Sequence, residues 1–378
     1  MDKQTISRRT VLEGLAAAGV AASLTGGAQA EANSSGDAVD LAIITEPGGG
    51  HVSSFLQGLS TCRGIGRVAI ADPSGATFEF GRSQVGNRLS AFRDYQEMLQ
   101  KFRPNLTIVT LAADRAPPAI GASLEEKSHV MSDKPSCVRV EDYAPLVDIA
   151  DKNDCHLMMA LSTRSSSAVQ KARQLVQDGF LGKPYSTTMD WIADQTRLKN
   201  PKYHQSWLAF KDRAGGGKLI YHGIHYLDLI QYLFSDPIQQ VAAFCENVGG
   251  QPIEVEDAAV VSFRCRSGMV GTLNAGYYLD RGYHNQVRVW GSTGWFHVDL
   301  PSGEPMQWHS THRNAPKGVQ EFYYAGEAGG YVVMMQQAID AALGQAEPPI
   351  TGPECLQVLK VIFAAYRAAE TGTTQQVG

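Results

Sequence analysis

The sequence predicts an α/β fold, in which an N-terminal Rossmann-like domain with a parallel sheet is followed by a C-terminal α+β domain with a large, open, mostly antiparallel sheet. Three observations predict it. The chain has 378 residues, a length typical of two domains. Its first half alternates apolar runs with helical patterns, whereas strand patterns separated by tight turns dominate its second half. Hydrophobic residues make up 43% and charged residues 19%, values that exclude a disordered chain.

Residues 1–30 have the order of an export signal. The motif Ser7-Arg8-Arg9-Thr10-Val11-Leu12 precedes an Ala-rich apolar run, and Ala28-Gln29-Ala30 offers a small-residue cleavage site. The motif resembles the twin-arginine export signal, with Val11 where an aromatic residue is usual. An ordinary secretory signal and an amphipathic helix are the alternatives. We therefore expect the twin-arginine export machinery as a partner, cleavage after Ala30, and a periplasmic protein. The apolar run is too short for stable membrane insertion.

Three near-continuous apolar runs follow, and they predict buried parallel strands over residues 39–45, 67–71 and 106–111. Helical patterns separate them, one with Phe55, Leu56 and Leu59 on one side and another over residues 95–102. Strands that alternate with helices are typical of a doubly wound sheet. We assign residues 31–162 to the Rossmann-like domain.

The second half predicts consecutive strands joined by tight turns. Helices are expected at about 166–178, 217–234, 330–343 and 354–370. The expected strands are 185–192, 239–246, 257–264, 269–276, 286–290 and 295–299. We assign residues 163–350 to a C-terminal domain that binds substrate and mediates oligomerisation, and residues 351–378 to a C-terminal helix and tail.

Charge and cysteine content exclude two function classes. There are 33 basic and 38 acidic side chains, a net charge of −5, so no basic excess is available to neutralise nucleic-acid phosphates. The six cysteines form no C-x-x-C pair, which excludes a zinc ribbon. We expect neither a nucleic-acid partner nor a metal site.

The run Gly48-Gly49-Gly50 lies between a predicted strand and a predicted helix, the setting in which a dinucleotide pyrophosphate binds. Thr45 and His51 flank the run and are further cofactor candidates. The order departs from G-x-G-x-x-G, because Thr45, Glu46 and Pro47 stand where glycines are expected. Asp72 closes the second strand, where a carboxylate accepts hydrogen bonds from a ribose and repels a 2′-phosphate, which favours NAD over NADP. A flexible loop and an Asp-Pro turn are the alternatives.

Several short motifs then follow in a fixed order. They are Asp133-Lys134-Pro135; Gly215-Gly216-Gly217 and the helix Gly223-Ile224-His225-Tyr226-Leu227-Asp228; Glu256-Asp257; Gly291-Ser292-Thr293-Gly294; and Glu370-Thr371-Gly372. The series resembles the Gfo/Idh/MocA oxidoreductases over nearly all of the mature chain. The resemblance implies the Rossmann fold and a nicotinamide cofactor, with Lys134 and Pro135 at the cofactor.

The resemblance also implies catalytic residues. The family's lysine at the position of Lys134 is catalytic, and its cation would stabilise a developing alkoxide. His225 matches the family's histidine, which is suited to proton exchange at neutral pH. Tyr221, His225 and Asp228 are spaced to share one helix face. Tyr221 stands where the commonest family residue is Asp, and it is the third catalytic candidate because its hydroxyl can donate and accept a hydrogen bond. A surface lysine and a packed core histidine are the alternative interpretations.

Substrate contacts are predicted in two further places. The segment with Tyr203, His204 and Trp207 mixes rings that stack on sugars with polar groups that bind hydroxyls, although Trp207 is nearly as well explained as an anchor of its loop. Arg164 matches a family position near the nicotinamide, and pairing with an acidic neighbour is its alternative. His222 and Asp228 are further polar candidates for substrate contacts. Asp228 is expected to orient a neighbouring group or cap the helix rather than to react.

These observations favour an NAD(P)-dependent oxidoreductase that acts on a hydroxyl of a sugar, an inositol or a related polyol. The alternatives are an NAD-dependent glycoside hydrolase that works by transient oxidation and elimination, and a non-catalytic binding protein. We also expect a homodimer or homotetramer that associates through the open face of the C-terminal sheet. The apolar candidates for that face are Val260, Phe263, Val270, Leu273, Val287 and Val289.

Overall fold

The computed structural model describes residues 38–300, 304–324 and 330–378, which belong to one compact unit. The predicted signal peptide lies outside the described residues. Within the described part of the chain, no helix has the length and apolar character needed to cross a bilayer.

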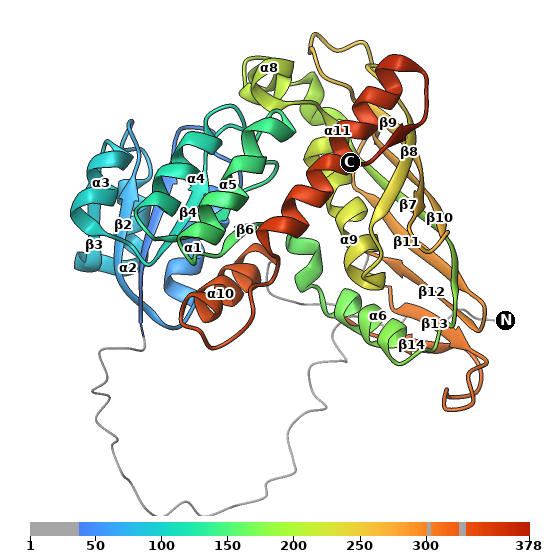
Figure 1. Cartoon of the computed structure of the whole chain (residues 1–378). Coiled ribbons are helices and arrows are strands. Elements are labelled where there is room, and N and C mark those ends of the chain that lie inside the picture. Colours follow the sequence, from blue (N-terminus) through green and yellow to red (C-terminus); the bar gives the residue numbers. More distant parts are fainter. Residues whose placement is uncertain (1–37, 301–303, 325–329) are drawn as a thin grey trace, which may run out of the picture. The chain divides into compact units, whose positions relative to one another are not determined.

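The N-terminal domain is built on a parallel sheet of six strands in the order β3-β2-β1-β4-β5-β6 (Figure 1). The strands are β1 (Val39–Thr45), β2 (Ile65–Ala71), β3 (Leu89–Phe92), β4 (Leu106–Thr110), β5 (His129–Ser132) and β6 (Leu157–Met159). This is the strand order of dinucleotide-binding Rossmann domains, and the order reverses between β1 and β4, where ligands of such sheets bind. The predicted Rossmann-like sheet is therefore confirmed.

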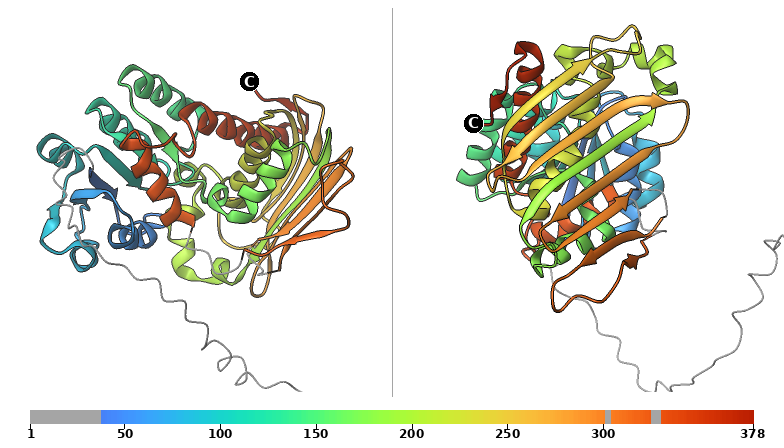
Figure 2. Two further views of the ribbon diagram at one scale, coloured as in Figure 1. Left: turned by 90° about the horizontal axis from the view of Figure 1, so that it is seen from below. Right: turned by 90° about the vertical axis from the view of Figure 1, so that its right-hand side faces the viewer.

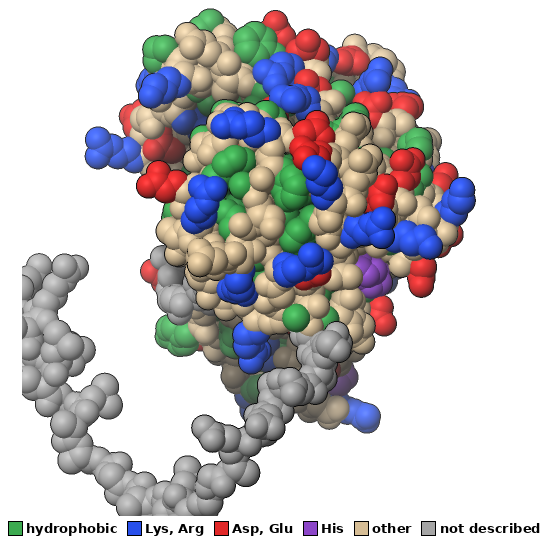
Figure 3. Space-filling model, turned by 90° about the vertical axis from the view of Figure 1, so that its left-hand side faces the viewer, with side chains coloured by type: hydrophobic (Ala, Val, Ile, Leu, Met, Phe, Trp, Pro, Cys, Tyr) green, Lys and Arg blue, Asp and Glu red, His purple; other side chains and the backbone are tan. Residues whose placement is uncertain are grey.

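Helices cover both faces of this sheet, which is why its central strands are mostly apolar. Residues 41–44 of β1, for example, are almost completely inaccessible to water. The helices are α1 (Val52–Thr61), α2 (Phe78–Val85), α3 (Tyr95–Phe102), α4 (Ala116–Glu125) and α5 (Val140–Lys152), with the 3₁₀ turn η1 (Gly86–Arg88). Figure 1 shows α3, α4 and α5 on one face, with α1 and α2 on the other. Basic and acidic side chains are interspersed on the outer surface of this domain (Figure 3).

The C-terminal domain is built on a sheet of nine strands in the order β14-β13-β12-β11-β7-β10-β9-β8-β15. The strands are β7 (Pro184–Asp194), β8 (Ile238–Glu246), β9 (Ala258–Cys265), β10 (Val270–Leu279), β11 (His284–Gly291), β12 (Gly294–Asp299), β13 (Met306–Ser310), β14 (Gln320–Phe322) and β15 (Gln375–Gln376). Among the described strands, only β7 and β10 pair in parallel, because a long connection separates them in the chain. The predicted mostly antiparallel sheet is confirmed.

Helices cover one face of the nine-stranded sheet and leave the other open (Figure 2). The longer helices are α6 (Ser167–Gln177), α9 (Ile224–Phe234), α10 (Gly330–Ala342) and α11 (Gly352–Thr371). The short ones are α7 (Pro201–His204), α8 (Lys211–Ala214), η2 (Ser162–Ser165), η3 (Thr196–Lys199), η4 (Trp207–Ala209) and the π-helical turn η5 (Leu219–Gly223). α11 contacts β8 and α9 as well as α5, and α10 packs on α1, so the two domains share helices.

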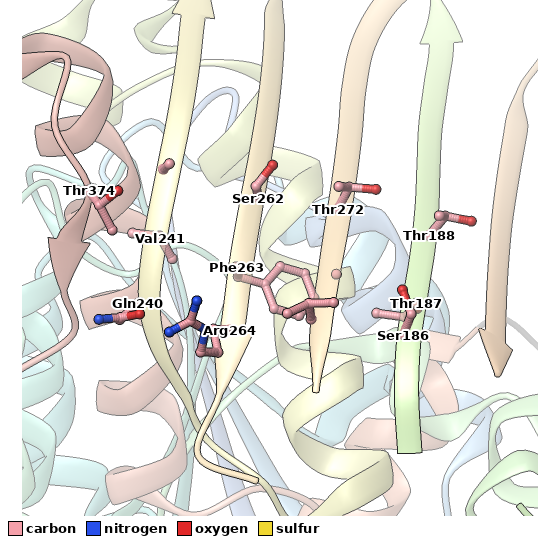
Figure 4. A pocket seen from close by; sticks show the side chains of 13 residues that line it. Ser186, Thr187, Thr188, Gln240, Val241, Ser262, Phe263, Arg264, Thr272 and Thr374 are labelled. Carbon is pink, nitrogen blue, oxygen red and sulfur yellow. The ribbon is translucent and has the colours of Figure 1, made fainter. Parts of the chain in front are cut away.

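The open face is more polar than the sequence predicted. Of the six apolar candidates, Val260 and Val270 point outward and are 44% and 46% exposed. Phe263, Leu273, Val287 and Val289 are buried instead. The assignment was wrong for these four because successive strand residues alternate between faces, and the six candidates mix both parities. The lining of a hollow on this face includes the hydroxyl side chains of Ser186, Thr188, Ser262 and Thr272 (Figure 4).

Candidate active site

The glycine turn after β1 packs tightly on the carboxyl ends of the neighbouring strands. A Cβ atom on Gly49 would collide with the carbonyl oxygen of Thr110 and lie 2.8 Å from Oγ1 of Thr45. A Cβ on Gly50 would collide with the carboxylate of Asp133. Thr45 accepts a hydrogen bond of 2.8 Å from the Thr110 hydroxyl. The two glycines therefore bring the backbone close to the ends of β4 and β5.

This turn fits a dinucleotide. It lies at the point where the strand order reverses, and it leads directly into α1. No side chain of the described residues caps the N-terminus of α1, so its first N–H groups remain available for an anion such as a pyrophosphate. Glu46 does not leave an unpaired negative charge here, because its carboxylate accepts a hydrogen bond from the Ala112 N–H, at 2.8 Å, and binds the Arg115 guanidinium.

Asp72 lies at the end of β2, as expected for a ribose ligand, but its carboxylate is engaged within its own turn. It is fully buried and accepts hydrogen bonds from the N–H and hydroxyl groups of Ser74 and Thr77, at 2.7–3.0 Å. Burial would raise its pKa, but these bonds outweigh that effect and hold the pKa below its usual value. The structure thus shows the turn, and the ribose contact stays a prediction.

Lys134 follows β5, and its ammonium group lies against Tyr221. Nζ donates a hydrogen bond of 2.7 Å to the Tyr221 carbonyl oxygen and lies 3.0 Å from the centroid of the Tyr221 ring. Burial lowers the pKa of Lys134 to about 7; Asp133 opposes the shift and Arg197 adds to it. Near neutral pH, Lys134 therefore has substantial populations of both protonation states.

His225, on α9, belongs to the same cluster and is 3% exposed. Its Nδ1 has no hydrogen-bond partner among the described residues, and its ring centroid lies 5.3 Å from that of Trp191. Burial lowers the pKa of His225 well below its usual value, and the charges of Lys134 and His51 add to the shift. At neutral pH the imidazole is therefore uncharged.

Tyr221 and His222 complete this part of the cluster from η5. Burial and the nearby Asp133 raise the pKa of Tyr221 to about 12, so its hydroxyl stays protonated. Nδ1 of His222 lies 3.3 Å from the hydroxyl of Tyr277. Burial and the charges of Lys218 and Lys134 lower the pKa of His222 well below its usual value.

Asp133 and His51 connect the glycine turn after β1 with the cluster around Lys134. Nδ1 of His51 lies 3.0 Å from both carboxylate oxygens of Asp133, and its ring stacks on Tyr331 with the centroids 4.0 Å apart. His51 was predicted at the cofactor, whereas Asp133 and Tyr331 were not singled out. The signal for Asp133 was its place in the Asp-Lys-Pro motif.

Two predicted substrate residues lie elsewhere and bind each other. The Arg164 guanidinium donates to both carboxylate oxygens of Asp228, at 2.8 and 2.6 Å, and a further bond of 3.0 Å goes to Glu354. Both Arg164 and Asp228 are buried. The structure favours the alternative expected for each, an acidic partner for Arg164 and an orienting role for Asp228.

The predicted substrate loop has a mainly structural role in this geometry. Nε1 of Trp207 donates to the Gly48 carbonyl oxygen at 3.1 Å, so the loop is anchored on the glycine turn. Nε2 of His204 lies 2.5 Å from the Leu198 carbonyl oxygen. Tyr203 does approach the cluster, since its ring centroid lies 5.3 Å from the Arg197 guanidinium.

Comparison with known proteins agrees with this geometry. Residues 48–161 match the family model of the oxidoreductase family with an NAD-binding Rossmann fold, and residues 169–297 match the GFO/IDH/MocA C-terminal domain. Together the two matches span more than half of the chain. The chain belongs to the Gfo/Idh/MocA family. As a member of that family, it is an NAD-dependent oxidoreductase whose N-terminal sheet is the NAD-binding domain.

Individual Gfo/Idh/MocA relatives are distant. Myo-inositol 2-dehydrogenase of Thermotoga maritima is 21% identical over 286 residues, which cover 74% of this chain and 82% of the relative. An oxidoreductase domain protein from Kribbella flavida has a TM-score of 0.81 at 20% identity, covering 90% of this chain and 99% of that one. A levoglucosan dehydrogenase in complex with NADH and levoglucosan has a TM-score of 0.78 at 17% identity, covering 90% and 99%. At these identities the two structures show the fold alone.

Proposed function

We propose that this protein is an NAD-dependent dehydrogenase that oxidises a hydroxyl-bearing carbon of a sugar, an inositol or a related polyol. The observation that supports it most strongly is the cluster of Lys134, Tyr221 and His225, in which Lys134 and His225 are buried and Lys134 follows the Rossmann strand β5. The names of the relatives, an inositol dehydrogenase and a levoglucosan dehydrogenase, support the substrate class.

The cluster provides what such an oxidation requires. The bound nicotinamide supplies the hydride acceptor, and the protein has to remove the hydroxyl proton. His225 accepts that proton as an uncharged imidazole. Lys134, in its protonated state, donates a hydrogen bond to the same hydroxyl oxygen and stabilises the negative charge that develops there.

Tyr221 changes how the lysine is held. The Tyr221 carbonyl oxygen and ring contact the ammonium group of Lys134 at the position where the family usually has an aspartate. These contacts bind an ammonium ion less strongly than a carboxylate would, so burial prevails and the pKa of Lys134 falls to about 7. Lys134 is therefore able to gain or lose a proton near neutral pH.

The proposed binding of NAD is tested on protein purified from its native compartment. Mass spectrometry is expected to detect a bound dinucleotide, and titration of the apo protein is expected to show tighter binding of NAD than of NADP. Equal affinities would count against a ribose contact at Asp72. The absence of binding by either nucleotide would move the protein to the non-catalytic alternative.

We further propose that the protein reaches the periplasm by twin-arginine export, a route that carries folded proteins with a bound cofactor. The motif at Arg8 and Arg9 supports this proposal. The double variant Arg8→Lys/Arg9→Lys is expected to remain in the cytoplasm, whereas Lys3→Arg is expected to export normally. Cell fractionation measures both, and a normal periplasmic yield of the double variant would rule the route out.

A further inference from the structure

A second lysine lies beside the candidate active site, and the chemistry described above does not use it. Lys218 precedes η5 and is fully buried. Its Nζ lies 4.5 Å from the ring centroid of Tyr277 and 5.8 Å from that of Trp191. Within the described part of the chain, this nitrogen has no hydrogen-bond partner. A buried lysine nitrogen without a hydrogen-bond partner is costly in either protonation state, so it calls for a functional explanation.

Arg197, from η3, approaches the same rings. Its guanidinium carbon lies 5.3 Å from the ring centroid of Tyr203 and 5.7 Å from those of Tyr221 and Tyr277. No carboxylate among the described residues forms an ion pair with Arg197 or Lys218. Because Tyr221 also contacts Lys134, three cationic side chains converge on two tyrosine rings.

Nearby carboxylates are engaged by other groups. Asp133 binds His51. Glu256, close to Lys218 in the fold, accepts hydrogen bonds from the N–H groups of Gly217 and Leu219 and from the Tyr366 hydroxyl. Asp194, which lies within electrostatic range of Arg197, accepts from Thr196. Among the described residues, none of these three acids forms an ion pair with Lys218 or Arg197.

Trp191 adds a second buried donor without an acceptor. Its indole Nε1 has no hydrogen-bond partner among the described residues, and its ring is bordered by Lys218, His222 and His225. An ammonium group and an indole N–H are donors only. The group that satisfies them must therefore supply acceptor oxygens, and next to two cations those oxygens are best provided by an anion.

We propose that the substrate carries a carboxylate and that Lys218 and Arg197 bind it, with Trp191 as a further donor, so that the protein acts on a sugar acid such as a hexuronate or an aldonate. This inference rests on the proposed dehydrogenase function. A carboxylate suits the site better than a phosphate monoester does. The guanidinium can bind either anion through two oxygens, but a carboxylate carries a single negative charge and needs fewer donors than a phosphate monoester does.

The electrostatics of the free site agree with this assignment. Burial lowers the pKa of Lys218 to about 6, and the charges of Arg197 and Lys134 add to the shift. A carboxylate beside Lys218 raises that pKa again. Binding near neutral pH is therefore expected to take up a proton.

The test compares matched ligands on one protein. Isothermal titration is performed on the NADH-loaded protein, in which no oxidation can follow binding. The probes are D-glucuronate, D-galacturonate and D-gluconate, the parent hexoses, and glucose 6-phosphate. At least one sugar acid is expected to bind about tenfold or more tightly than its neutral parent. Lys218→Met is expected to abolish that preference, whereas Lys202→Met, a change at an exposed lysine, is expected to keep it.

Each outcome decides between the claims. Equal or tighter binding of the neutral hexoses, no detectable binding of any of the three sugar acids, or an unchanged preference in Lys218→Met would overturn the carboxylate site. Tighter binding of glucose 6-phosphate would assign the cations to a phosphate and overturn it as well. Tight binding of a sugar acid that never reduces bound NAD would support the carboxylate site and contradict the proposed dehydrogenase function. Reduction of NAD by neutral sugars alone would support the proposed dehydrogenase function and contradict the carboxylate site.

Discussion

At the scale of single residues, the site gathers buried cations whose charges are suppressed in the free protein. The pKa of Lys134 falls to about 7 and that of Lys218 to about 6, and in both cases burial is the main cause. A lysine that is partly uncharged at neutral pH is able to exchange protons with substrate. The same burial makes each lysine costly to the fold when no ligand is bound.

Lys218→Met is therefore expected to stabilise the ligand-free protein. Between about pH 6 and 10.5 the unfolded chain binds a proton at Lys218 that the folded chain lacks. The contribution of Lys218 to the parent's free energy of unfolding therefore becomes less unfavourable as the pH rises. We expect the variant to gain about 3 kcal/mol in the free energy of unfolding near pH 7 and less as the pH approaches 10.5. Urea unfolding at several pH values measures this difference. A loss of stability, or a gain that does not depend on pH, would contradict the assignment.

At the scale of helices and strands, the glycine turn depends on a helix of the other domain. η4 carries Trp207, whose indole N–H binds the Gly48 carbonyl oxygen. Trp207→Phe keeps the ring and removes this bond. We expect NAD binding to weaken about threefold to tenfold. Trp295→Phe, on β12, is the matched control. Unchanged NAD affinity in Trp207→Phe would show that the turn is held without this contact.

The hydrophobic pattern predicted several helices and strands well, because burial against the core determines where apolar residues stand in each element. The predicted strand at 39–45 and the helix at 95–102 match β1 and α3 in full. The predicted helix at 217–234 was less accurate, because its first turn is π-helical. Tyr221 lies in that π turn, whereas His225 and Asp228 both lie in the regular helix α9. The expected common site of the three residues does not form. Asp228 binds Arg164 instead.

Part of the site had no signal in the sequence alone. Lys134, Tyr221 and His225 were identified because they stand in motifs, and the structure brings them together. Arg197 and Trp191 lie in segments without a motif, and only tertiary packing places them at the cluster. Lys218 did have a signal, since it is a lysine in an otherwise apolar stretch directly after three glycines.

At the scale of the whole molecule, the open face of the nine-stranded sheet remains the proposed oligomer interface. Phe244 is 78% exposed there, and Val260 and Val270 lie on the neighbouring strands of the same face. We expect a dimer or tetramer in sedimentation and a weakened assembly in Phe244→Asp, because a charge would be buried at the contact. Phe80→Asp, at an exposed phenylalanine of α2, is the control. A parent protein that sediments only as a monomer would exclude this interface.

The central claim is that Lys134 and His225 carry out the oxidation of a substrate hydroxyl. Single-turnover reduction of bound NAD, followed at the absorbance of the reduced cofactor with the panel of sugars, polyols and sugar acids, tests it most directly. Lys134→Ala and His225→Ala are each expected to slow this reduction about 10²–10⁴-fold while NAD binding persists. Lys202→Ala is expected to match the parent. If Lys134→Ala reduces the cofactor as fast as the parent does, the assignment of the active site is wrong.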